Sequence, residues 1–486
     1  MCVPSWRFLK RDAFRRSGDT TPTSTASISR KCELNPAPTF RAAIVGAGPA
    51  GLYAAEKLLS RRDLNVEIDL FDRLATPWGL VRAGVAPDHP EKKLVIDRQF
   101  DFYLKNPRVQ FIGNVEIGSA VLHREIAEWY DAIIYAVGAT SDNPMGIPGE
   151  ELPGCWSARE FVGFYNGHPD YAHLKFDLSC ERAIVIGNGN VAIDVARILT
   201  APMRILEKTD IADHALDLLR GSAIKEVMVL GRRASFQAAF NNPELEELEH
   251  LEGVDIAVEG ADIPGLETVL CDLDWQTKRK LETLNRLSSR PRRDDAKRIT
   301  LRFLTSPVRI FGPDKVRKVS TIGNALTFHR GEYRVQPTEL EESVDTGLIF
   351  RAIGYRALPF PGLPFDSERG VIRNLEGRVI DDYGVQVGVY VTGWVKRGCR
   401  GIIGSNRKCA SETIRHLFED LDAGLLTKPR LSRDAVMARL KAKGIPVVNL
   451  NGWLAIDRVE RDNGRAEDRP RRKITDRETQ LRHAFS

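Results

Sequence analysis

Two stretches of the chain share one pattern of apolar and polar positions. Residues 43–59, "AIVGAGPAGLYAAEKLL", and 183–199, "AIVIGNGNVAIDVARIL", each run from a short apolar segment through a glycine-rich turn into apolar residues at helical spacing. A second strand-like run follows each of them, at 64–73 and at 224–233. The pattern predicts two β-α-β units, and therefore an α/β protein with two Rossmann-like dinucleotide-binding domains.

The first turn has the spacing of a dinucleotide-binding loop. Gly46, Gly48 and Gly51 form G-x-G-x-x-G, in which the glycines permit a tight turn, a close approach of the pyrophosphate, and close packing of helix on strand. Asp72 ends the next strand, where an acid is expected to bind a ribose hydroxyl. An ordinary small-residue turn is the alternative, and Asp72 favours the dinucleotide.

The second turn has the same spacing but a different ending. It reads G-x-G-x-x-A, and its following strand ends in Arg232 and Arg233 instead of an acid. Because guanidinium groups form charge-assisted forks with phosphate oxygens, this pair predicts the 2′-phosphate of NADP(H). Two solvated arginines are the alternative. The loop residues expected to contact this cofactor are Gly187, Asn188, Gly189, Asn190 and Val191.

Two adjacent dinucleotides suggest electron transfer between cofactors, with FAD in the first site and NADP(H) in the second. We therefore expect an FAD-binding domain formed by residues 39–140 and 360–486, and an NADP(H)-binding domain formed by residues 141–359. Residues 1–38 are rich in Arg, Ser and Thr and are predicted to be a disordered extension. The basic stretch 275–302 is predicted to be helical, either a solvated face or a docking surface. The charged segment 464–478 is predicted to be a loosely packed tail.

Composition narrows the class of protein further. The chain has 486 residues, 42% of them hydrophobic and 28% charged, with a net charge of +5, which predicts a globular protein that does not bind nucleic acid. No apolar run approaches the ~20 residues of a transmembrane helix. Its seven cysteines contain no C-x-x-C pair, which argues against a metal site, an iron–sulfur cluster or a redox dithiol, and favours a reducing compartment. We expect the bacterial cytoplasm, or the mitochondrial matrix if residues 1–38 are a transit peptide.

Several motifs together resemble one family. They are "TPWGLVRAGVAPDHP" at 76–90, "IPGEELPG" at 147–154, "GNGNVAIDVARIL" at 187–199, "GRRASFQAAF" at 231–240, and "GWVKRG" with "GIIGSN" between 393 and 406. From about residue 40 to about residue 460 the chain is similar to the adrenodoxin reductase type of ferredoxin–NADP⁺ reductase, whose fold is of the glutathione reductase type.

The resemblance implies an activity and further site residues. NADPH would reduce FAD, and the flavin would pass single electrons to a ferredoxin or adrenodoxin-like iron–sulfur protein, with a cytochrome P450 as one conceivable final acceptor. The protein is expected to be a monomer. The polar pair near the nicotinamide and the flavin would be His89 and Glu244. The residues implied to contact FAD are Ala50, Asp72, Leu80, Val115, Trp394, Gly401, Ile402 and Ile403, and Gly401 would also face NADP(H).

Two departures from the family pattern raise specific questions. Ala234-Ser235-Phe236 stands where the family has Gly-Pro-Leu, so the resemblance does not say how the NADP(H) loop closes. Cys399-Arg400 stands in the flavin loop where the family has Pro-Thr, which would bring a positive charge and a thiol near the flavin. Two other activities stay open at this point: an electron-input subunit like the small subunit of glutamate synthase, and a flavin monooxygenase.

Overall fold

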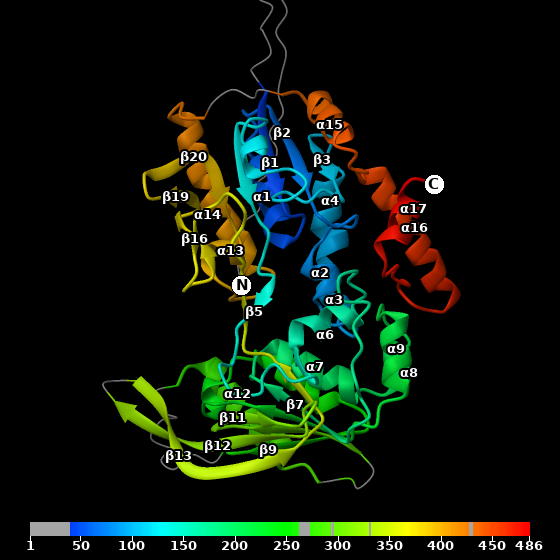
Figure 1. Ribbon diagram of the computed structural model, residues 1–486, viewed down its shortest axis with the longest axis vertical. Helices are drawn as coiled ribbons and strands as arrows, with labels where there is room; N and C mark the ends of the chain where they lie inside the picture. The colour runs from blue at the N-terminus through cyan, green and yellow to red at the C-terminus, as the bar shows by residue number, and fades with distance from the viewer. Residues whose placement is uncertain (1–38, 262–272, 292, 294–295, 330–331, 427–430) are drawn as a thin grey trace, which may run out of the picture. The chain divides into compact units, whose positions relative to one another are not determined.

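The first glycine loop follows a strand of a seven-stranded sheet. Residues 39–261, 273–291, 293, 296–329, 332–426 and 431–486 are described by the computed structural model. The strand order is β18 (Asn374–Leu375), β19 (Arg378–Asp381), β20 (Gly384–Val391), β4 (Ala132–Tyr135), β1 (Phe40–Val45), β2 (Val66–Phe71) and β3 (Val109–Ile112). The five strands from β20 to β3 are parallel (Figure 1). This part of the chain is therefore a Rossmann-like sheet, as the sequence predicts.

The side chains of β1 point alternately to the two faces of this sheet, and both faces are covered. Ala42 and Ile44 belong to one apolar cluster, and Ala43 and Val45 to another. The first cluster includes residues of α1 (Pro49–Ser60), α4 (Asp101–Leu104), α14 (Ser405–Asp422) and α16 (Leu450–Ala466). The second includes residues of α5 (His123–Ile126) and α15 (Arg433–Ala442), with one strand of the small pair β16 (Phe365–Asp366) and β17 (Val371–Ile372).

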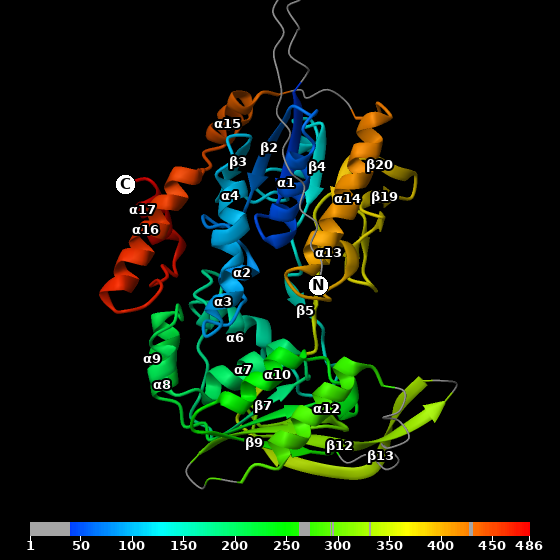
Figure 2. The same cartoon turned by 180° about the vertical axis from the view of Figure 1, so that it is seen from behind.

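A second, entirely parallel sheet contains the second glycine loop. Its order is β6 (Cys155–Ser157), β14 (Leu348–Arg351), β7 (Arg182–Ile186), β8 (Glu226–Leu230), β10 (Lys297–Arg302) and β9 (Val254–Glu259). One core cluster gathers α6 (Ala158–Tyr165), α7 (Asn190–Thr200), α8 (Met203–Leu206), α9 (Asp213–Arg220), α10 (Asn242–Glu247) and α12 (Trp275–Ser288) (Figure 2). The other cluster joins this sheet to the antiparallel sheet of β11 (Thr305–Phe311), β12 (Lys318–His329) and β13 (Glu332–Asp345). Both predicted β-α-β units are therefore present.

The two sheets are connected where β5 (Ser141–Asp142) pairs with β15 (Tyr355–Arg356). The predicted boundaries at 140 and 360 fall beside this crossing. Residues 39–486 nevertheless form one compact unit, so the division into two domains stays a prediction. The predicted extension 1–38 lies outside the described residues. No helix in the described ranges is long and apolar enough to cross a membrane.

Two expectations about the charged segments are wrong. The stretch 275–302 is helical only as far as Ser288, and residues 297–302 form β10, which lies between β8 and β9. The tail predicted at 464–478 is packed: α16 continues to Ala466 and α17 spans Arg477–Ala484. Glu460, Arg471 and Lys473 are buried because each charge has an opposite partner, and charge content alone could not reveal this pairing.

Candidate active site

The first glycine loop begins where β1 ends. Gly46 has φ +110°, and a Cβ atom on it would lie 2.5 Å from the carbonyl oxygen of Ala136 at the end of β4. A Cβ atom on Gly51 would lie 2.0 Å from the carbonyl oxygen of Gly46. The turn and the close packing of α1 on β1 therefore both require glycine, for the reasons that the spacing predicts.

Backbone from two other segments completes this loop. A Cβ atom on Gly79 would lie 2.9 Å from Gly48 Cα, and one on Gly393 would lie 2.7 Å from Ala50 Cβ. Gly48 caps α1 without a side-chain hydrogen bond, so the first N–H groups of the helix point toward the cradle. A surface of bare backbone and unpaired N–H groups fits the pyrophosphate of FAD.

Asp72 binds the loop itself. Its Oδ2 accepts a hydrogen bond from the Ala47 N–H at 2.8 Å, and its Oδ1 accepts one from the Leu74 N–H at 2.9 Å. Burial raises the pKa of Asp72 despite these two N–H donors. Each oxygen retains a second lone pair, so a ribose hydroxyl can still donate to it, and this role of Asp72 stays a prediction.

The remaining residues implied to contact FAD lie on three segments. Leu80 begins α2 (Leu80–Ala83) and is partly exposed, whereas Val115 is buried and its N–H donates to the Asp72 carbonyl at 2.9 Å. Trp394 begins α13 (Trp394–Arg397), and its buried Nε1 has no hydrogen-bond partner among the described residues. A buried indole N–H needs an acceptor, which FAD can supply. Gly401, Ile402 and Ile403 lie directly before α14, and the side chain of Ile402 is exposed.

The second loop repeats the first at the end of β7. Gly187 has φ +116°, and a Cβ atom on it would lie 2.3 Å from the carbonyl oxygen of Ala352 after β14. A Cβ atom on Gly189 would meet nothing within 4 Å among the described atoms, so this face of the loop is open to a ligand. Asn190 begins α7, and Val191 packs partly against the core. The loop fits a second dinucleotide.

The segment after β8 closes around this loop without the Gly-Pro-Leu of the family. The Phe240 N–H donates to the Asn188 carbonyl at 3.0 Å, and the Asn241 N–H donates to Asn190 Oδ1 at 2.8 Å. Ala234 and Ser235 are buried, and the Phe236 ring contacts Tyr333 of β13 with 5.3 Å between centroids. Packing against the β12–β13 hairpin therefore anchors the closing segment.

Arg232 and Arg233 are exposed at the end of β8. Their backbone carbonyls are fixed, because Asn324 Nδ2 donates to the first at 2.9 Å and the Leu304 N–H donates to the second at 3.1 Å. Within the part of the chain that the structure describes, neither guanidinium pairs with a carboxylate. Both are available to a phosphate dianion, which fits NADP(H).

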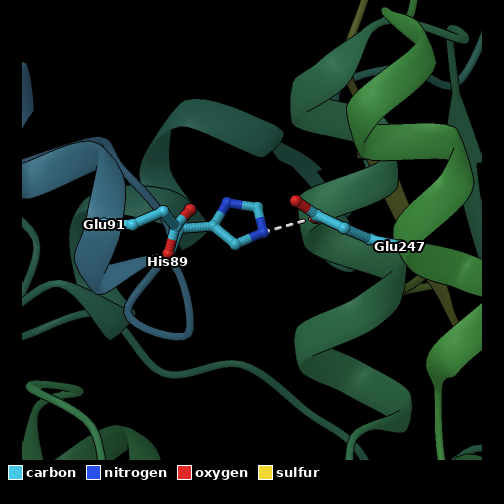
Figure 3. Close-up of side chains that lie close together, drawn as sticks. All are labelled: His89, Glu91 and Glu247. Carbon is cyan, nitrogen blue, oxygen red and sulfur yellow. Dashed lines mark hydrogen bonds and ion pairs between the residues drawn. The ribbon is translucent and has the colours of Figure 1, made fainter.

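His89 has a different acidic neighbour from the one implied by the resemblance. Its Nε2 lies 2.6 Å from Glu247 Oε2 at the end of α10 (Figure 3). Among the described residues, Glu244, one helical turn earlier on the same face, is joined to His89 through Lys92, whose Nζ lies 3.2 Å from Glu244 Oε1 and 3.0 Å from His89 Nδ1. The structure therefore pairs His89 with Glu247, which the sequence analysis missed because both acids share one helix face.

Arg197 completes this cluster from α7. Its guanidinium contacts the His89 ring and donates to Glu247 Oε2 at 2.5 Å. Burial opposes ionisation of Glu247, but the hydrogen bond with His89 and the positive charges of Arg197 and Lys92 outweigh it, so the pKa of Glu247 is lowered. Glu247 is therefore a carboxylate, which accepts a hydrogen bond from Arg197 and has His89 Nε2 within hydrogen-bond distance.

The geometry of His89, Glu91 and Glu247 raises the question of a metal. Their ligand atoms lie within 4.8 Å of one another. Lys92 and Arg197 already place two cationic groups against the His89 ring, so a metal ion would meet positive charge at both ring nitrogens. The cluster fits an ion-pair network better than a metal centre.

Cys399 and Arg400, which replace the Pro-Thr of the family, have defined surroundings in the structure. Burial raises the pKa of the Cys399 thiol to about 11, which disfavours the reactive thiolate. Arg400 is exposed, and its carbonyl accepts a hydrogen bond from Arg397, whose guanidinium also donates to Ser405 Oγ and Asn406 Oδ1. The backbone of this loop is thereby tied to the start of α14 through Arg397.

Proteins of known activity are similar to this chain in sequence. Residues 40–259 match the family model described as pyridine nucleotide-disulphide oxidoreductase. The NADPH-ferredoxin reductase FprA of Mycobacterium leprae is 44% identical over 441 residues, which cover 89% of this chain and 95% of that protein. The mitochondrial NADPH:adrenodoxin oxidoreductase of Mus musculus is 39% identical over 494 residues, covering 99% and 98%.

A solved structure agrees with these sequence matches. The structure of Mycobacterium tuberculosis FprA in complex with NADPH superimposes with a TM-score of 0.87 at 41% identity, covering 92% of this chain and 100% of that one. The chain therefore belongs to the adrenodoxin reductase type of ferredoxin–NADP⁺ reductases, within the pyridine nucleotide-disulphide oxidoreductases.

Proposed function

We propose that this oxidoreductase takes electrons from NADPH and delivers them to a ferredoxin-type iron–sulfur protein, with FAD as its resident cofactor. The observation that carries the proposal is the asymmetry between its two glycine loops. The strand after the first loop ends in Asp72, whose carboxylate binds that loop, and the strand after the second ends in the exposed pair Arg232 and Arg233. One site therefore suits an adenosine ribose, and the other suits a 2′-phosphate.

The residues proposed to hold FAD are those of the first cradle. Gly46, Gly48 and Gly51 present the backbone, and the N-terminus of α1 faces the pyrophosphate. Trp394 Nε1 offers a buried donor to the flavin. When bound, FAD supplies hydride acceptance and single-electron donation, which no side chain can perform.

His89 and Glu247 are proposed to face the nicotinamide end of the second site. With a proton on Nε2, the His89 ring donates to Glu247 and accepts from Lys92 at Nδ1. The pair is at least half-buried and held by charged neighbours, so it presents a fixed polar edge to a ligand. We propose Glu247 in place of Glu244 as the acidic partner in this role.

The partner, oligomeric state and compartment belong to the same proposal. The relatives named for ferredoxin and adrenodoxin support a small iron–sulfur protein as electron acceptor. The mycobacterial relative is more similar than the mitochondrial one, which favours a bacterial cytoplasm. We expect a monomer, because a reductase that releases its partner after each electron needs no permanent interface.

The test begins with the purified protein. Flavin released by heat should co-elute with FAD on chromatography, and NADPH oxidation coupled to cytochrome c should require one member of a panel of ferredoxins. NADH should be a poor donor. Release of FMN, or no flavin after growth with excess riboflavin, would refute the first-site assignment. Oxygen-coupled hydroxylation without ferredoxin would indicate a monooxygenase, and a large co-purifying subunit would indicate an electron-input module.

A further inference from the structure

Arg197 is a buried arginine that joins three separate segments. It lies on α7, the helix that starts at the second glycine loop, and only 1% of its surface is exposed. Its Nη2 donates to Asp194 Oδ1 on the same helix at 3.1 Å and to Asp88 Oδ1 at 2.9 Å. Its Nη1 donates to Glu247 Oε2 at 2.5 Å and also contacts the ring of His89.

We propose that Arg197 is a positioning residue, which holds the Asp88-His89 turn and Glu247 in register with the helix of the NADP(H) loop. This inference rests on the proposed function. The turn follows α2 in the part of the chain assigned to FAD, whereas α7 and Glu247 belong to the second sheet. One planar guanidinium therefore fixes the relative position of groups expected on both cofactors.

The shape of the guanidinium matters as much as its charge. Its two terminal nitrogens donate in different directions, Nη2 toward Asp88 and Asp194, and Nη1 toward Glu247. A lysine ammonium is a single point and cannot span these acceptors. Because buried groups within a network act together, loss of the fork would free the His89 turn even if the positive charge remained.

The charges around Arg197 make its removal visible in a pH profile. The titratable and charged groups around Arg197 and Glu247 are Tyr165 on α6, Asp88, His89, Glu91 and Lys92 around α3 (Pro90–Lys93), Asp194 on α7, and Glu244 and Glu247 on α10. Five of these are carboxylates, and Lys92 would be the one remaining fixed cation among them. Without Arg197, the mutual repulsion of the carboxylates would favour protonation of Glu247 at a higher pH.

The test compares Arg197→Gln and Arg197→Lys with wild type in the FAD-loaded protein. The rate at which excess NADPH bleaches the flavin absorbance should fall about 10- to 100-fold in both variants, while the NADPH affinity changes less than about threefold. In Arg197→Gln the acid limb of this rate should also move up by about one pH unit, and in Arg197→Lys it should stay near wild type. Amide hydrogen exchange of residues 86–94 should accelerate in both variants, which is a readout independent of turnover.

A matched control separates positioning from general loss of a buried arginine. Arg41 is also buried and pairs with Asp69 and Glu67 at one edge of β1, without contact to His89. Arg41→Gln should lose stability but keep the reduction rate, the pH profile and the exchange of residues 86–94. If Arg197→Gln fails to fold, Asp88→Asn removes the tie to the turn without an unpaired buried charge, and should show the same slowed rate and faster exchange.

Wild-type values for the rate and the exchange in either Arg197 variant, or in Asp88→Asn, would overturn the inference. A loss of NADPH affinity as large as the loss of rate would also overturn it, because Arg197 would then act on binding. Failure of the proposed function is distinguishable: in that case the wild-type protein itself would not retain FAD or be bleached by NADPH.

Discussion

Glu460 of α16 and Arg82 of α2 form an ion pair in the interior, with Arg82 Nη1 donating to Glu460 Oε2 at 2.9 Å. The Glu460 side chain has no exposed surface, and Arg471 Nη1 donates to the same oxygen at 2.9 Å. The charges of the C-terminal segment are therefore compensated by a helix almost 380 residues earlier in the chain. Burial of such groups is favourable only while every partner is present.

We expect Glu460→Gln to lower the free energy of unfolding by about 3–5 kcal/mol, because the buried guanidinium of Arg82 loses its counter-charge and that of Arg471 keeps only Asp457. Urea unfolding at saturating FAD measures this effect. The control is Glu252→Gln, whose partner Arg204 is as exposed as Glu252 itself, and which should cost less than about 1 kcal/mol. Equal stability of Glu460→Gln and wild type would show that the tail contributes no buried network.

Asp170 contributes to the free energy of unfolding by an amount that depends on pH in the acid range. Arg73 and Arg477 both bind its carboxylate, at 2.6 and 2.7 Å, and although burial opposes ionisation, these hydrogen bonds lower the pKa of Asp170 to about 2. An unfolded aspartate titrates near 3.9, so this contribution is complete above about pH 4 and is lost as the pH falls toward about 2.

Asp170→Asn should therefore lower the stability at neutral pH and flatten its decline between about pH 4 and about pH 2. Urea midpoints of wild type and variant across this range measure the difference. Asp63→Asn changes an exposed carboxylate and should leave the pH dependence as it is in wild type. Parallel pH curves for Asp170→Asn and wild type would contradict the assignment.

The sequence predicts best what depends on neighbouring residues. Both glycine loops were found because their constraints act over a few positions: Gly46 and Gly187 each need a positive φ directly after a strand. The partner of His89 was missed because the contact spans 158 residues, and only packing selects Glu247 over Glu244 on one face of α10. The buried tail was missed for the same reason, since the partners that neutralise it are distant in sequence.

Cofactor preference should depend on Arg232 and Arg233. Both are exposed after β8, and a charge-assisted hydrogen bond contributes about 1.5–3 kcal/mol. Arg232→Ala or Arg233→Ala should therefore weaken NADPH binding by about 10- to 100-fold and leave NADH binding nearly unchanged. Titration of each nucleotide into the FAD-loaded protein measures this. Arg62→Ala, which removes an exposed arginine after α1, serves as the control. An unchanged ratio of NADPH affinity to NADH affinity in the Arg232 and Arg233 variants would show that the two arginines are solvated and do not bind the 2′-phosphate.

The basic surface formed by α12 and by Arg290 and Arg293 after it offers less free charge than the sequence predicts. Arg279, Arg286 and Arg293 form ion pairs with Glu246, Glu249 and Asp255 respectively. Arg292 lies outside the described residues. Because paired charges produce a weak field at a distance, this surface is a poorer attractor for an acidic ferredoxin than the sequence suggests.

A variant of Arg290 distinguishes a docking surface from a solvated one, since its guanidinium donates to the carbonyl of Glu249 and to no carboxylate of the described residues. If this basic surface is only solvated, Arg290→Glu should change the KM for ferredoxin by less than about twofold. Ferredoxin reduction by the wild-type protein should still slow with added salt, because screening acts over ~8 Å at physiological ionic strength. Reduction of a small neutral acceptor should be insensitive to salt. A large rise in the ferredoxin KM of Arg290→Glu, with the NADPH KM unchanged, would instead identify this basic surface as the docking surface.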